Sequence, residues 1–397
     1  MQNGNNPECT TSLQWTGRRV DLFITELYVG GAEKCLTNLA LFLKKQGAAV
    51  RVFSLASLPL APEDSLVQRM HQAGIAVYGL GADRVWNAGS AIIKLRKYLY
   101  DSPPDVLQSF LFHANMIASA ALVGLPGRRG TPSSKRLNWV AGVRVADPRK
   151  QRLAMESLAF RHADRIVAVS QGARLAYQKY SPIHSSKWSV IPNGIALASD
   201  DGQEVAWQSL GLPSCAKIAL FVGRLDAQKG VTWLIDTASD WLSALPQHHL
   251  VIAGKGNQLD MLRTQLAQLQ SKQPEIAHRI HLVGWLAEPR KWMRLSEVLL
   301  LPARYEGMPN VCLEAMAEGR PVVAFDVEGI RELLGEPSEG QVIPPQNREA
   351  WQAAIKRIAT DESLRNSLGI RNREKMELDF QLSLQLQKYA DLYLSLG

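Results

Sequence analysis

The sequence predicts an α/β protein built from two doubly wound domains, each a parallel sheet with helices on both faces. At 397 residues, the chain is about two to three times as long as a typical domain, so it is expected to divide. With 46% hydrophobic and 21% charged residues, it can bury a core in each half. From Arg18 onward, short β-rich runs alternate with amphipathic stretches of helical length, in two separate series.

The first series defines a predicted domain over residues 18–195. Helical patterns separate most of its strands. The residues before it are polar and lack the apolar stretch of a signal peptide, so residues 1–17 are expected to form a flexible N-terminal tail. The predicted strands are Val20–Glu26, Ala49–Leu55, Ala76–Gly79, Val106–Phe110, Trp139–Val145, Ile166–Ser170 and Ser189–Ile191.

The second series defines a predicted domain over residues 196–376. The turn sequence Pro192-Asn193-Gly194 closes the first series and the polar stretch 199–203 precedes the second, which places the boundary near residue 195. The predicted strands are Lys217–Gly223, Leu250–Ala253, Ile280–Val283, Val298–Leu301, Val322–Phe325 and Gln341–Ile343.

Residues 377–397 are predicted to form a C-terminal helix. Leu378, Leu382, Leu386 and Tyr389 recur at helical spacing and form one apolar stripe. Because such a stripe needs a surface to cover, the helix is expected to pack back across the domains.

Cysteine usage and hydropathy exclude several classes of protein. The cysteines show neither a Cys-x-x-Cys pair nor paired histidine spacing, which argues against a disulfide framework or a zinc site and favours the cytoplasm. The longest apolar stretch, Met116–Leu125, is about half of the ~20 residues that a membrane-spanning helix needs, so no span is predicted. The cysteines are Cys9, Cys35, Cys215 and Cys312.

The carboxyl ends of two parallel sheets in tandem predict a ligand cleft between the domains. A dinucleotide oxidoreductase is the obvious competitor, but neither 28–32 nor 254–257 reads Gly-x-Gly-x-x-Gly, and no acidic residue stands at the ribose-binding distance. No Walker sequence is present either, which excludes a P-loop NTPase.

The segment 300–321 carries the densest chemistry. A strand ends near Leu301, a loop carries Glu306, Gly307 allows an unusual turn, Pro309 suits the first helical position, and Glu314 lies inside the short helix. The free N–H groups of that helix start favour a phosphate. Since two carboxylates would repel phosphates, they are expected to accept hydrogen bonds from a sugar and a ribose.

This segment resembles the Glu-x7-Glu motif of the retaining family 4 (group 1) glycosyltransferases, which have the two-domain GT-B fold. Pro302, Glu306-Gly307-Met308-Pro309-Asn310, Glu314-Ala315-Met316, Gly319 and Pro321-Val322-Val323 carry the resemblance. Phe221-Val222-Gly223-Arg224-Leu225 with Lys229-Gly230 resembles the same family's diphosphate-binding loop. Fixed cations there would stabilise a leaving nucleoside diphosphate, with Arg224 as a fork and Lys229 as a point charge.

The resemblance implies further substrate-binding positions. Gly254, in the stretch 250–256, would let the backbone approach the ligand, and Trp285 would flank the nucleobase. In the first domain, Gly30-Gly31-Ala32-Glu33 matches the family's opening loop, where Gly30 and Gly31 would approach donor phosphate and acceptor. His113 would contact the donor sugar. Arg144, after a strand of the first domain, is predicted to meet an anionic acceptor.

The implied activity is that of a hexosyltransferase that retains the anomeric configuration and needs neither metal nor cofactor. Glu306 and the backbone of Gly307, Met308, Pro309 and Asn310 would hold sugar and phosphate, while the departing phosphate helps to deprotonate the acceptor. A UDP-sugar donor is favoured. Ala303 and Glu328 depart from the usual Ser and Gly near the site, so the family pattern does not fix the donor.

Net charge differs between the predicted domains. Residues 1–195 contain 24 Lys and Arg against 12 Asp and Glu, whereas residues 196–397 contain 21 against 25. A basic cluster, opposed in the sequence only by Asp147, and the stretch 92–100 following Trp86 suggest peripheral contact with an anionic inner membrane and a glycan or lipid-pyrophosphate-linked acceptor. The cluster comprises Arg128, Arg129, Lys135, Arg136, Arg144, Arg149, Lys150 and Arg152.

Several alternatives stay open. The stretch 92–100 also fits a sheet-packing helix with a solvated basic face. An epimerase of nucleotide sugars, a phosphorylase of the same fold, or an inert sugar-binding homologue would share much of the pattern. Nucleic acid is excluded as a partner because the basic cluster has no interleaved aromatic platform. Polysaccharide or glycolipid biosynthesis is the expected setting.

Overall fold

A computed structural model describes residues 14–128, 136–180, 183–197, 205–336, 338 and 340–396. The chain forms two compact units. One runs to Asn193 and includes the C-terminal segment from Ser383, and the other is Gly194–Leu382. The polar stretch 199–203 lies outside the described residues.

The first unit is a seven-stranded parallel sheet in the order β3-β2-β1-β4-β5-β6-β7. Each predicted strand is present. The central strands β1, β4 and β5 are almost entirely buried, whereas the edge strand β3 has no buried residue. The order reverses beside β1, where β1 pairs with both β2 and β4, so the carboxyl ends of β1 and β4 face a topological switch point. The strands are β1 (Arg19–Ile24), β2 (Ala49–Ser54), β3 (Ala76–Gly79), β4 (Val106–Phe110), β5 (Asn138–Val143), β6 (Arg165–Ala168) and β7 (Trp188–Val190).

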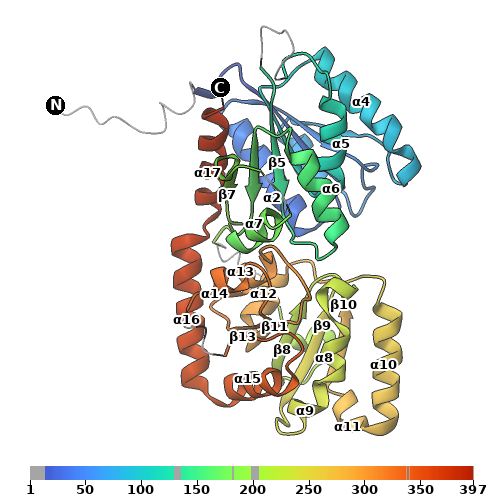
Figure 1. The fold of residues 1–397 in the computed structure, drawn as a ribbon. Coiled ribbons are helices and arrows are strands. Elements are labelled where there is room, and N and C mark those ends of the chain that lie inside the picture. Colours follow the sequence, from blue (N-terminus) through green and yellow to red (C-terminus); the bar gives the residue numbers. More distant parts are fainter. Residues whose placement is uncertain are drawn as a thin grey trace, which may run out of the picture. The chain divides into compact units, whose positions relative to one another are not determined.

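Helices cross from strand to strand, and α4, α5 and α6 stand side by side (Figure 1). The Ser170 side chain accepts the Ala173 N–H at 3.0 Å and so fixes the start of α7. The helices are α2 (Gly31–Lys45), α3 (Ser65–Gln72), α4 (Ala88–Asp101), α5 (Phe112–Leu122), α6 (Lys150–Phe160) and α7 (Gln171–Gln178).

The second unit is a six-stranded parallel sheet in the order β10-β9-β8-β11-β12-β13, again with its switch point beside the first strand of the series. This order makes β8 and β11 neighbours although 75 residues separate Val222 from Val298 by number. The strands are β8 (Lys217–Val222), β9 (His248–Ala253), β10 (Ile280–Gly284), β11 (Val298–Leu301), β12 (Val322–Phe325) and β13 (Val342–Ile343).

Side-chain caps begin the two long helices that close this unit. Asn347 accepts the Ala350 N–H and Asp361 accepts the Leu364 N–H, so α15 and α16 start where these residues stand. The helices are α8 (Thr232–Asp236), α9 (Ala238–Leu242), α10 (Leu259–Lys272), α11 (Pro274–Ala277), α12 (Pro289–Arg294), α13 (Asn310–Ala317), α14 (Ile330–Leu334), α15 (Arg348–Thr360) and α16 (Glu362–Asp379).

The single helix predicted from residue 377 is wrong. Helix α16 ends at Asp379 and α17 (Leu382–Leu394) begins after a break, because the backbone there pairs with Ile195 instead of continuing the helix. The Ile195 N–H donates to the Phe380 carbonyl at 2.9 Å and the Leu382 N–H donates to the Ile195 carbonyl at 3.1 Å. The predicted stripe is broken with it, since Leu378 is exposed while Leu386 is buried.

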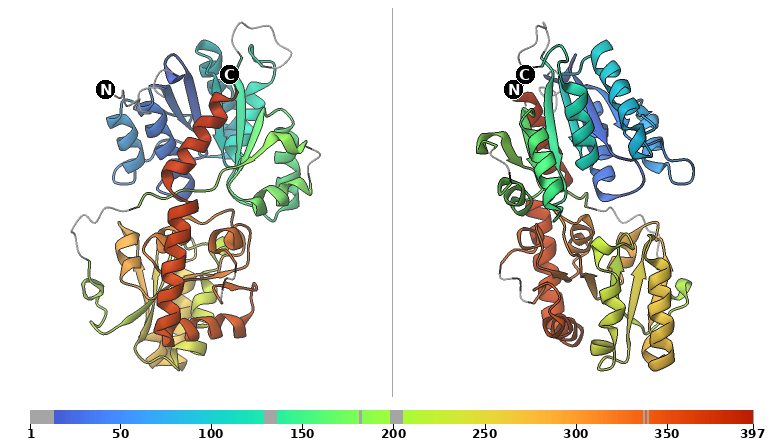
Figure 2. Two further views of the ribbon diagram at one scale, coloured as in Figure 1. Left: turned by 90° about the vertical axis from the view of Figure 1, so that its left-hand side faces the viewer. Right: turned by 45° about the vertical axis from the view of Figure 1, so that its right-hand side comes forward.

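Helix α17 completes the first unit (Figure 2). The Tyr393 hydroxyl donates to Gln108 Oε1 on β4 at 3.0 Å, and the Asn138 amide donates to the Leu396 carbonyl at 3.0 Å. Tyr389 and Tyr393 are both buried. The C-terminal residues are therefore part of the core of the first unit.

The predicted N-terminal tail extends too far. Residues 1–13 lie outside the described residues, but Trp15 is buried and its carbonyl accepts the Arg18 N–H at 3.1 Å, so residues 14–17 belong to the folded unit. In the described part of the chain, no helix combines the length and hydropathy that a membrane span requires.

Candidate functional site

Three loops meet at the carboxyl edge of the sheet in the second unit, following β8, β9 and β11. The Arg304 N–H donates to the Gln228 carbonyl at 2.8 Å, and Gln228 Nε2 donates to the Tyr305 carbonyl at 3.1 Å, which ties the loop after β11 to the loop after β8. The Leu225 N–H donates to the Lys255 carbonyl at 2.8 Å and adds the loop after β9. The loops thus form one connected backbone surface.

Glycines allow these loops to approach so closely. Gly230 has φ +63°, and a Cβ there would lie 2.0 Å from the Pro302 carbonyl oxygen. A Cβ on Gly254 would lie 1.8 Å from the Gly223 carbonyl oxygen. Only glycine fits at such positions, because any side chain would collide with the backbone of the neighbouring loop.

Lys229 and Glu306 form an ion pair across two of these loops. Lys229 Nζ lies 2.5 Å from Glu306 Oε1, and the two side chains are only 15% and 6% exposed. Asp226 accepts the backbone N–H of Lys229 at 3.1 Å and fixes the short turn that carries it. The structure therefore brings together two residues that the sequence assigned separately to phosphate and to sugar.

Arg224 lies on the same loop as Lys229 but is solvated. Its side chain is 69% exposed, with Nε 3.5 Å from Asp226 Oδ2 and Nη2 3.3 Å from Gln228 Oε1. Because an exposed pair at this distance is weak, the guanidinium is free to turn toward a charged ligand.

The helix after β11 begins at Asn310, with Pro309 as its N-cap residue, one position before the place predicted for this proline. Met308 and Glu314 are buried. Gly329, after β12, has φ +82°, and a Cβ there would lie 2.0 Å from the Gly307 carbonyl oxygen. The N-terminal end of α13 is thus held by the loop after β12.

Two further predicted positions lie near β10. The Gly254 N–H donates to the Gly284 carbonyl at 2.7 Å, which closes the ends of β9 and β10 against each other. Trp285 follows Gly284, which has φ +74°, and remains exposed. An exposed indole at this edge has a free face for stacking.

In the first unit, Gly30 and Gly31 stand at the start of α2 as predicted. Gly30 is the N-cap residue, and a Cβ there would lie 2.3 Å from Glu33 Oε2. The Glu33 carboxylate therefore folds over the first turn of α2, where the helix dipole favours it, and it is buried. No separate role was predicted for Glu33.

His113 lies in the first turn of α5 and is exposed. Burial of part of the ring, with Arg152 and Arg149 nearby, lowers its pKa, so the imidazole is neutral at neutral pH. The residue that begins this turn, Leu111, has φ +74° and ψ 158°, a conformation that is rare outside glycine. No glycine marks this strained turn in the sequence.

Arg144 is buried at the end of β5. Its Nη2 donates to Asn193 Oδ1 at 2.5 Å, and its guanidinium carbon lies 5.6 Å from the centre of the Phe110 ring. Burial opposes its charge, but Cys35 and Tyr389 beside it raise its pKa. The hydrogen bond thus links the end of β5 to Asn193, which follows β7 in the sequence.

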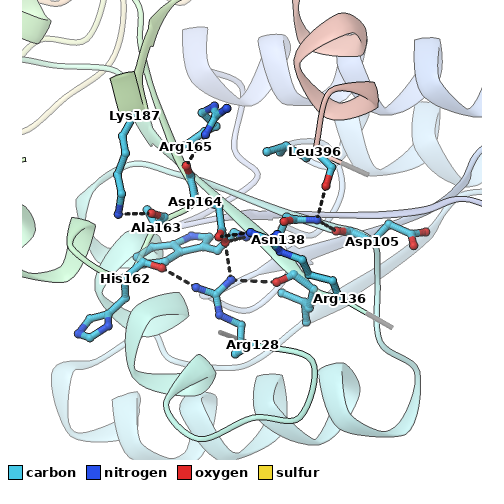
Figure 3. Close-up of polar contacts among 12 residues, drawn as sticks. Asp105, Arg128, Arg136, Asn138, His162, Ala163, Asp164, Arg165, Lys187 and Leu396 are labelled. Atoms are coloured by element: carbon cyan, nitrogen blue, oxygen red, sulfur yellow. Dashed lines mark hydrogen bonds and ion pairs between the residues drawn. The ribbon is translucent and has the colours of Figure 1, made fainter. Parts of the chain in front are cut away.

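The predicted basic cluster has a second counter-charge besides Asp147, contrary to the expectation that only Asp147 opposes it. Asp164 forms ion pairs with Arg128 at 2.6 Å and with Arg136 at 3.2 Å (Figure 3). Asp147 forms ion pairs with Arg149 and Arg152. The sequence could not show this because 36 positions separate Arg128 from Asp164. Arg129 and Lys135 lie outside the described residues.

Two models of known protein families match this chain. The family model described as glycosyl transferases group 1 matches residues 216–361, and the model described as Glycosyltransferase Family 4 matches residues 29–199.

Among curated relatives, an uncharacterised glycosyltransferase of Methanocaldococcus jannaschii is 29% identical over 58% of this chain and 59% of its own length. A phosphatidyl-myo-inositol mannosyltransferase of Mycobacterium leprae is 26% identical over 85% of both chains. The UDP-Gal:alpha-D-GlcNAc-diphosphoundecaprenol alpha-1,3-galactosyltransferase of Escherichia coli is 26% identical over 61% of this chain and 63% of its own. The chain thus spans less than two thirds of two of these relatives.

The structure of the Anabaena protein HepE in complex with UDP and glucose superposes with a TM-score of 0.78 at 19% identity, covering 95% of this chain and 99% of that one. Two family models that together span both units, and a solved fold that covers nearly all of the chain, lead to one assignment. The chain belongs to the family 4 (group 1) glycosyltransferases and has their GT-B fold.

Proposed function

We propose that this protein is a retaining glycosyltransferase that moves a hexose from a nucleoside-diphosphate sugar, with UDP as the favoured nucleotide, to a glycan or lipid-linked acceptor. The observation that carries the proposal is the Lys229–Glu306 pair, which lies beside the N-terminal end of α13. A cation, a carboxylate and the positive dipole end of a helix at one sheet edge suit a ligand that has both phosphates and hydroxyls.

In this proposal each group has one task. Lys229 and the mobile guanidinium of Arg224 neutralise the diphosphate as negative charge develops on it. The backbone from Gly307 to Asn310 binds phosphate oxygens. Glu306, oriented by Lys229, accepts hydrogen bonds from donor-sugar hydroxyls, and Glu314 accepts from the ribose.

Retention follows if the acceptor attacks from the side that the diphosphate leaves. The bond from the anomeric carbon to the phosphate oxygen breaks, a bond from that carbon to the acceptor oxygen forms, and the acceptor proton passes to the departing phosphate. No protein nucleophile is needed, so Glu306 positions the sugar instead of attacking it. Neutral His113 and the loop at Gly30 and Gly31 would contact the donor from the first unit.

Two variants test the site. We expect Glu306→Ala and Lys229→Ala each to lower the rate of transfer by orders of magnitude while the fold is kept. Because either change leaves a partly buried charge unpaired, the double variant with Lys229→Met and Glu306→Gln serves as the uncharged control for stability. Near-native activity in both single variants would refute the proposed site.

One set of incubations with nucleotide sugars identifies both the donor and the class of reaction. Incubation with UDP, GDP and ADP sugars in the absence of acceptor should give slow release of nucleoside diphosphate for a transferase. Epimerised sugar would indicate the epimerase, and phosphate-dependent release of sugar phosphate would indicate the phosphorylase. With an acceptor, the anomeric configuration of the product, read by NMR, tests retention.

The proposal extends to an anionic membrane surface, through α4. Trp86, Ile93 and Tyr100 stand at seven-residue intervals and are 73%, 70% and 66% exposed, while Leu95 and Leu99 are buried. Helix α4 therefore packs on the sheet and still presents an apolar stripe. Two relatives of the protein are named for lipid compounds, a phosphatidyl-myo-inositol and an alpha-D-GlcNAc-diphosphoundecaprenol. Acceptors of this kind suit an enzyme that works at a lipid surface.

Cations border this stripe. The Arg84 guanidinium carbon lies 5.1 Å from the centre of the Trp86 ring, and the Lys97 side chain is 75% exposed. Aromatic and aliphatic side chains beside exposed cations suit the headgroup region of an anionic bilayer. The inner face of the plasma membrane is the corresponding site in a cytoplasmic enzyme.

Flotation with liposomes tests this contact. The wild type should float with anionic vesicles and not with neutral ones, and the variant Trp86→Ala with Ile93→Ala should lose flotation. Met261→Ala with Leu378→Ala, which removes exposed apolar side chains of the second unit, is the matched control and should float. Equal flotation with both vesicle types would refute the proposed contact with an anionic membrane.

A further inference from the structure

A chain of buried hydrogen bonds joins β5, β4, α5, α6 and α7 inside the first unit. Trp139 Nε1 donates to Ser109 Oγ at 2.9 Å, and the Ser109 hydroxyl donates to Asn115 Oδ1 at 2.6 Å. Asn115 Nδ2 donates to Glu156 Oε1 at 2.5 Å, and the Tyr177 hydroxyl donates to Glu156 Oε2 at 2.5 Å. All five side chains are at most 3% exposed, so the chain ends on a carboxylate that is hidden from solvent.

This carboxylate has an unusual environment. Among the described residues no cation lies within ion-pair distance of Glu156, and the charged groups near it are Arg152 on the same helix and Asp147 just before it. Burial raises its pKa to about 7, against the hydrogen bonds from Tyr177 and Asn115. A glutamine of the same shape would avoid this desolvation cost, so stability alone does not account for a carboxylate here.

The network acts on one place, the first turn of α5. Asn115 also donates to the Gly142 carbonyl at 3.0 Å, and its backbone N–H donates to the Leu111 carbonyl at 2.9 Å. Leu111 is the residue with φ +74°. A non-glycine residue keeps such a conformation only where its surroundings hold it, and the buried Asn115 side chain, fixed at three points, supplies that restraint.

Helix α6 reaches the same turn through a second side chain. The Arg152 guanidinium carbon lies 4.8 Å from the centre of the Phe112 ring, and this ring meets His113 edge-on at 5.2 Å. Arg152 stands one helical turn before Glu156, so both residues face α5 from one side of α6. The position of His113 thus depends on how α6 is set against α5.

We infer that Glu156 is a positioning residue: through Asn115 it holds the strained first turn of α5 in the conformation that presents His113 to the donor sugar. The inference rests on the proposed role of His113. It assigns to the reaction a residue that cannot touch the substrate, because Glu156 is 1% exposed. Its effect is geometric, and a displacement of about 1 Å can cost about a hundredfold in rate.

The test is a double-variant cycle with Glu156→Met, which removes the acceptor for Asn115, and His113→Ala in the full-length protein. The donor is whichever of UDP-glucose, UDP-galactose, GDP-glucose and ADP-glucose the wild type hydrolyses fastest. Glu156→Met should lower kcat/KM about ten- to a hundredfold in the wild type and less than about threefold in His113→Ala. Glu156→Gln, whose carbonyl still accepts from Asn115, should lose less than about threefold. UDP affinity, which depends on the second unit, should not change. Tyr177→Phe, which removes one hydrogen bond but keeps the link to Asn115, is the control and should lose less than about threefold.

Two results would overturn the inference, and they can be told apart. If His113→Ala is impaired and Glu156→Met costs the same in both backgrounds, Glu156 acts independently of His113 and the positioning role is wrong. If His113→Ala is as active as the wild type, the proposed role of His113 fails and the inference fails with it. The proposed site at Lys229 and Glu306 is tested separately by its own variants.

Discussion

Replacing Glu156 with glutamine should change how stability depends on pH. Burial raises the pKa of Glu156 from its ordinary value of 4.5 to about 7 in the folded protein. Because the folded state binds this proton more tightly than the unfolded state, the free energy of unfolding falls as pH rises from about 4.5 to about 7. The difference of about 2.5 between the two pKa values, at about 1.4 kcal/mol for each, corresponds to about 3 kcal/mol.

Glutamine removes this pH-dependent cost but disturbs the hydrogen bonds. Its carbonyl can accept from Asn115, while its amide group meets the Tyr177 hydroxyl, which must then accept instead of donate. We assign about 1 kcal/mol to that rearrangement. Since the carboxylate cost is mostly absent at pH 5, Glu156→Gln should be about neutral or slightly destabilising there, and about 2 kcal/mol stabilising at pH 8.

Urea unfolding between pH 5 and 8 measures this difference. Hydrogen–deuterium exchange of peptides from β4 and β5 follows the first unit specifically, which is needed because a chain of two units need not unfold in one step. Asp21, whose pKa burial raises to about 6, adds a trend of the same sign. This trend is common to both proteins and cancels in their difference. A difference in stability that does not change with pH would refute the reasoning.

Three further predictions follow from single contacts. Gly230→Ala should destabilise the second unit by at least about 2 kcal/mol more than Gly211→Ala, measured by urea unfolding, because both have positive φ but only Gly230 lies against another loop. Asp164→Asn should cost about 3–5 kcal/mol at pH 7, since it removes the negative charge that lies 2.6 Å from buried Arg128. The pKa of Asp164 is lowered, so the wild type should lose this contribution as pH falls below about 4, and the gap to the variant should close in the same urea assay. Tyr393→Phe should lower the melting temperature of the first unit through the loss of about 1 kcal/mol from a buried hydrogen bond, measured by calorimetry.

The strands were predictable because each is a short β-rich run set between helical patterns or turn residues, which is a local property of the sequence. The break between α16 and α17 was not, since it depends on pairing with Ile195, which lies 186 positions from Gln381. The burial of Trp15 likewise requires a partner surface that the sequence near it does not reveal. The local sequence pattern therefore predicted which helices and strands form, whereas contacts between distant residues determine where they begin and end.

The same division holds for the candidate site. The motif around Glu306 and the loop with Lys229 were recognisable, but their ion pair, 77 positions apart, exists because β8 and β11 are neighbours in the sheet. The strain at Leu111 was invisible because no glycine or proline marks it. Arg144 was expected to face an acceptor. Its hydrogen bond to Asn193 could not be predicted, because the two residues are 49 positions apart and only the fold brings them together.

The last residues of the chain belong to the core of the first unit, and this has a consequence for biosynthesis. Gln108 emerges from the ribosome 285 positions before Tyr393, its hydrogen-bond partner. At about 5–20 residues per second, Gln108 waits roughly 15–60 s for Tyr393, and the whole second unit is made in that interval. The surface that α17 covers stays exposed until then, so the first unit cannot complete its core before the second unit has been synthesised.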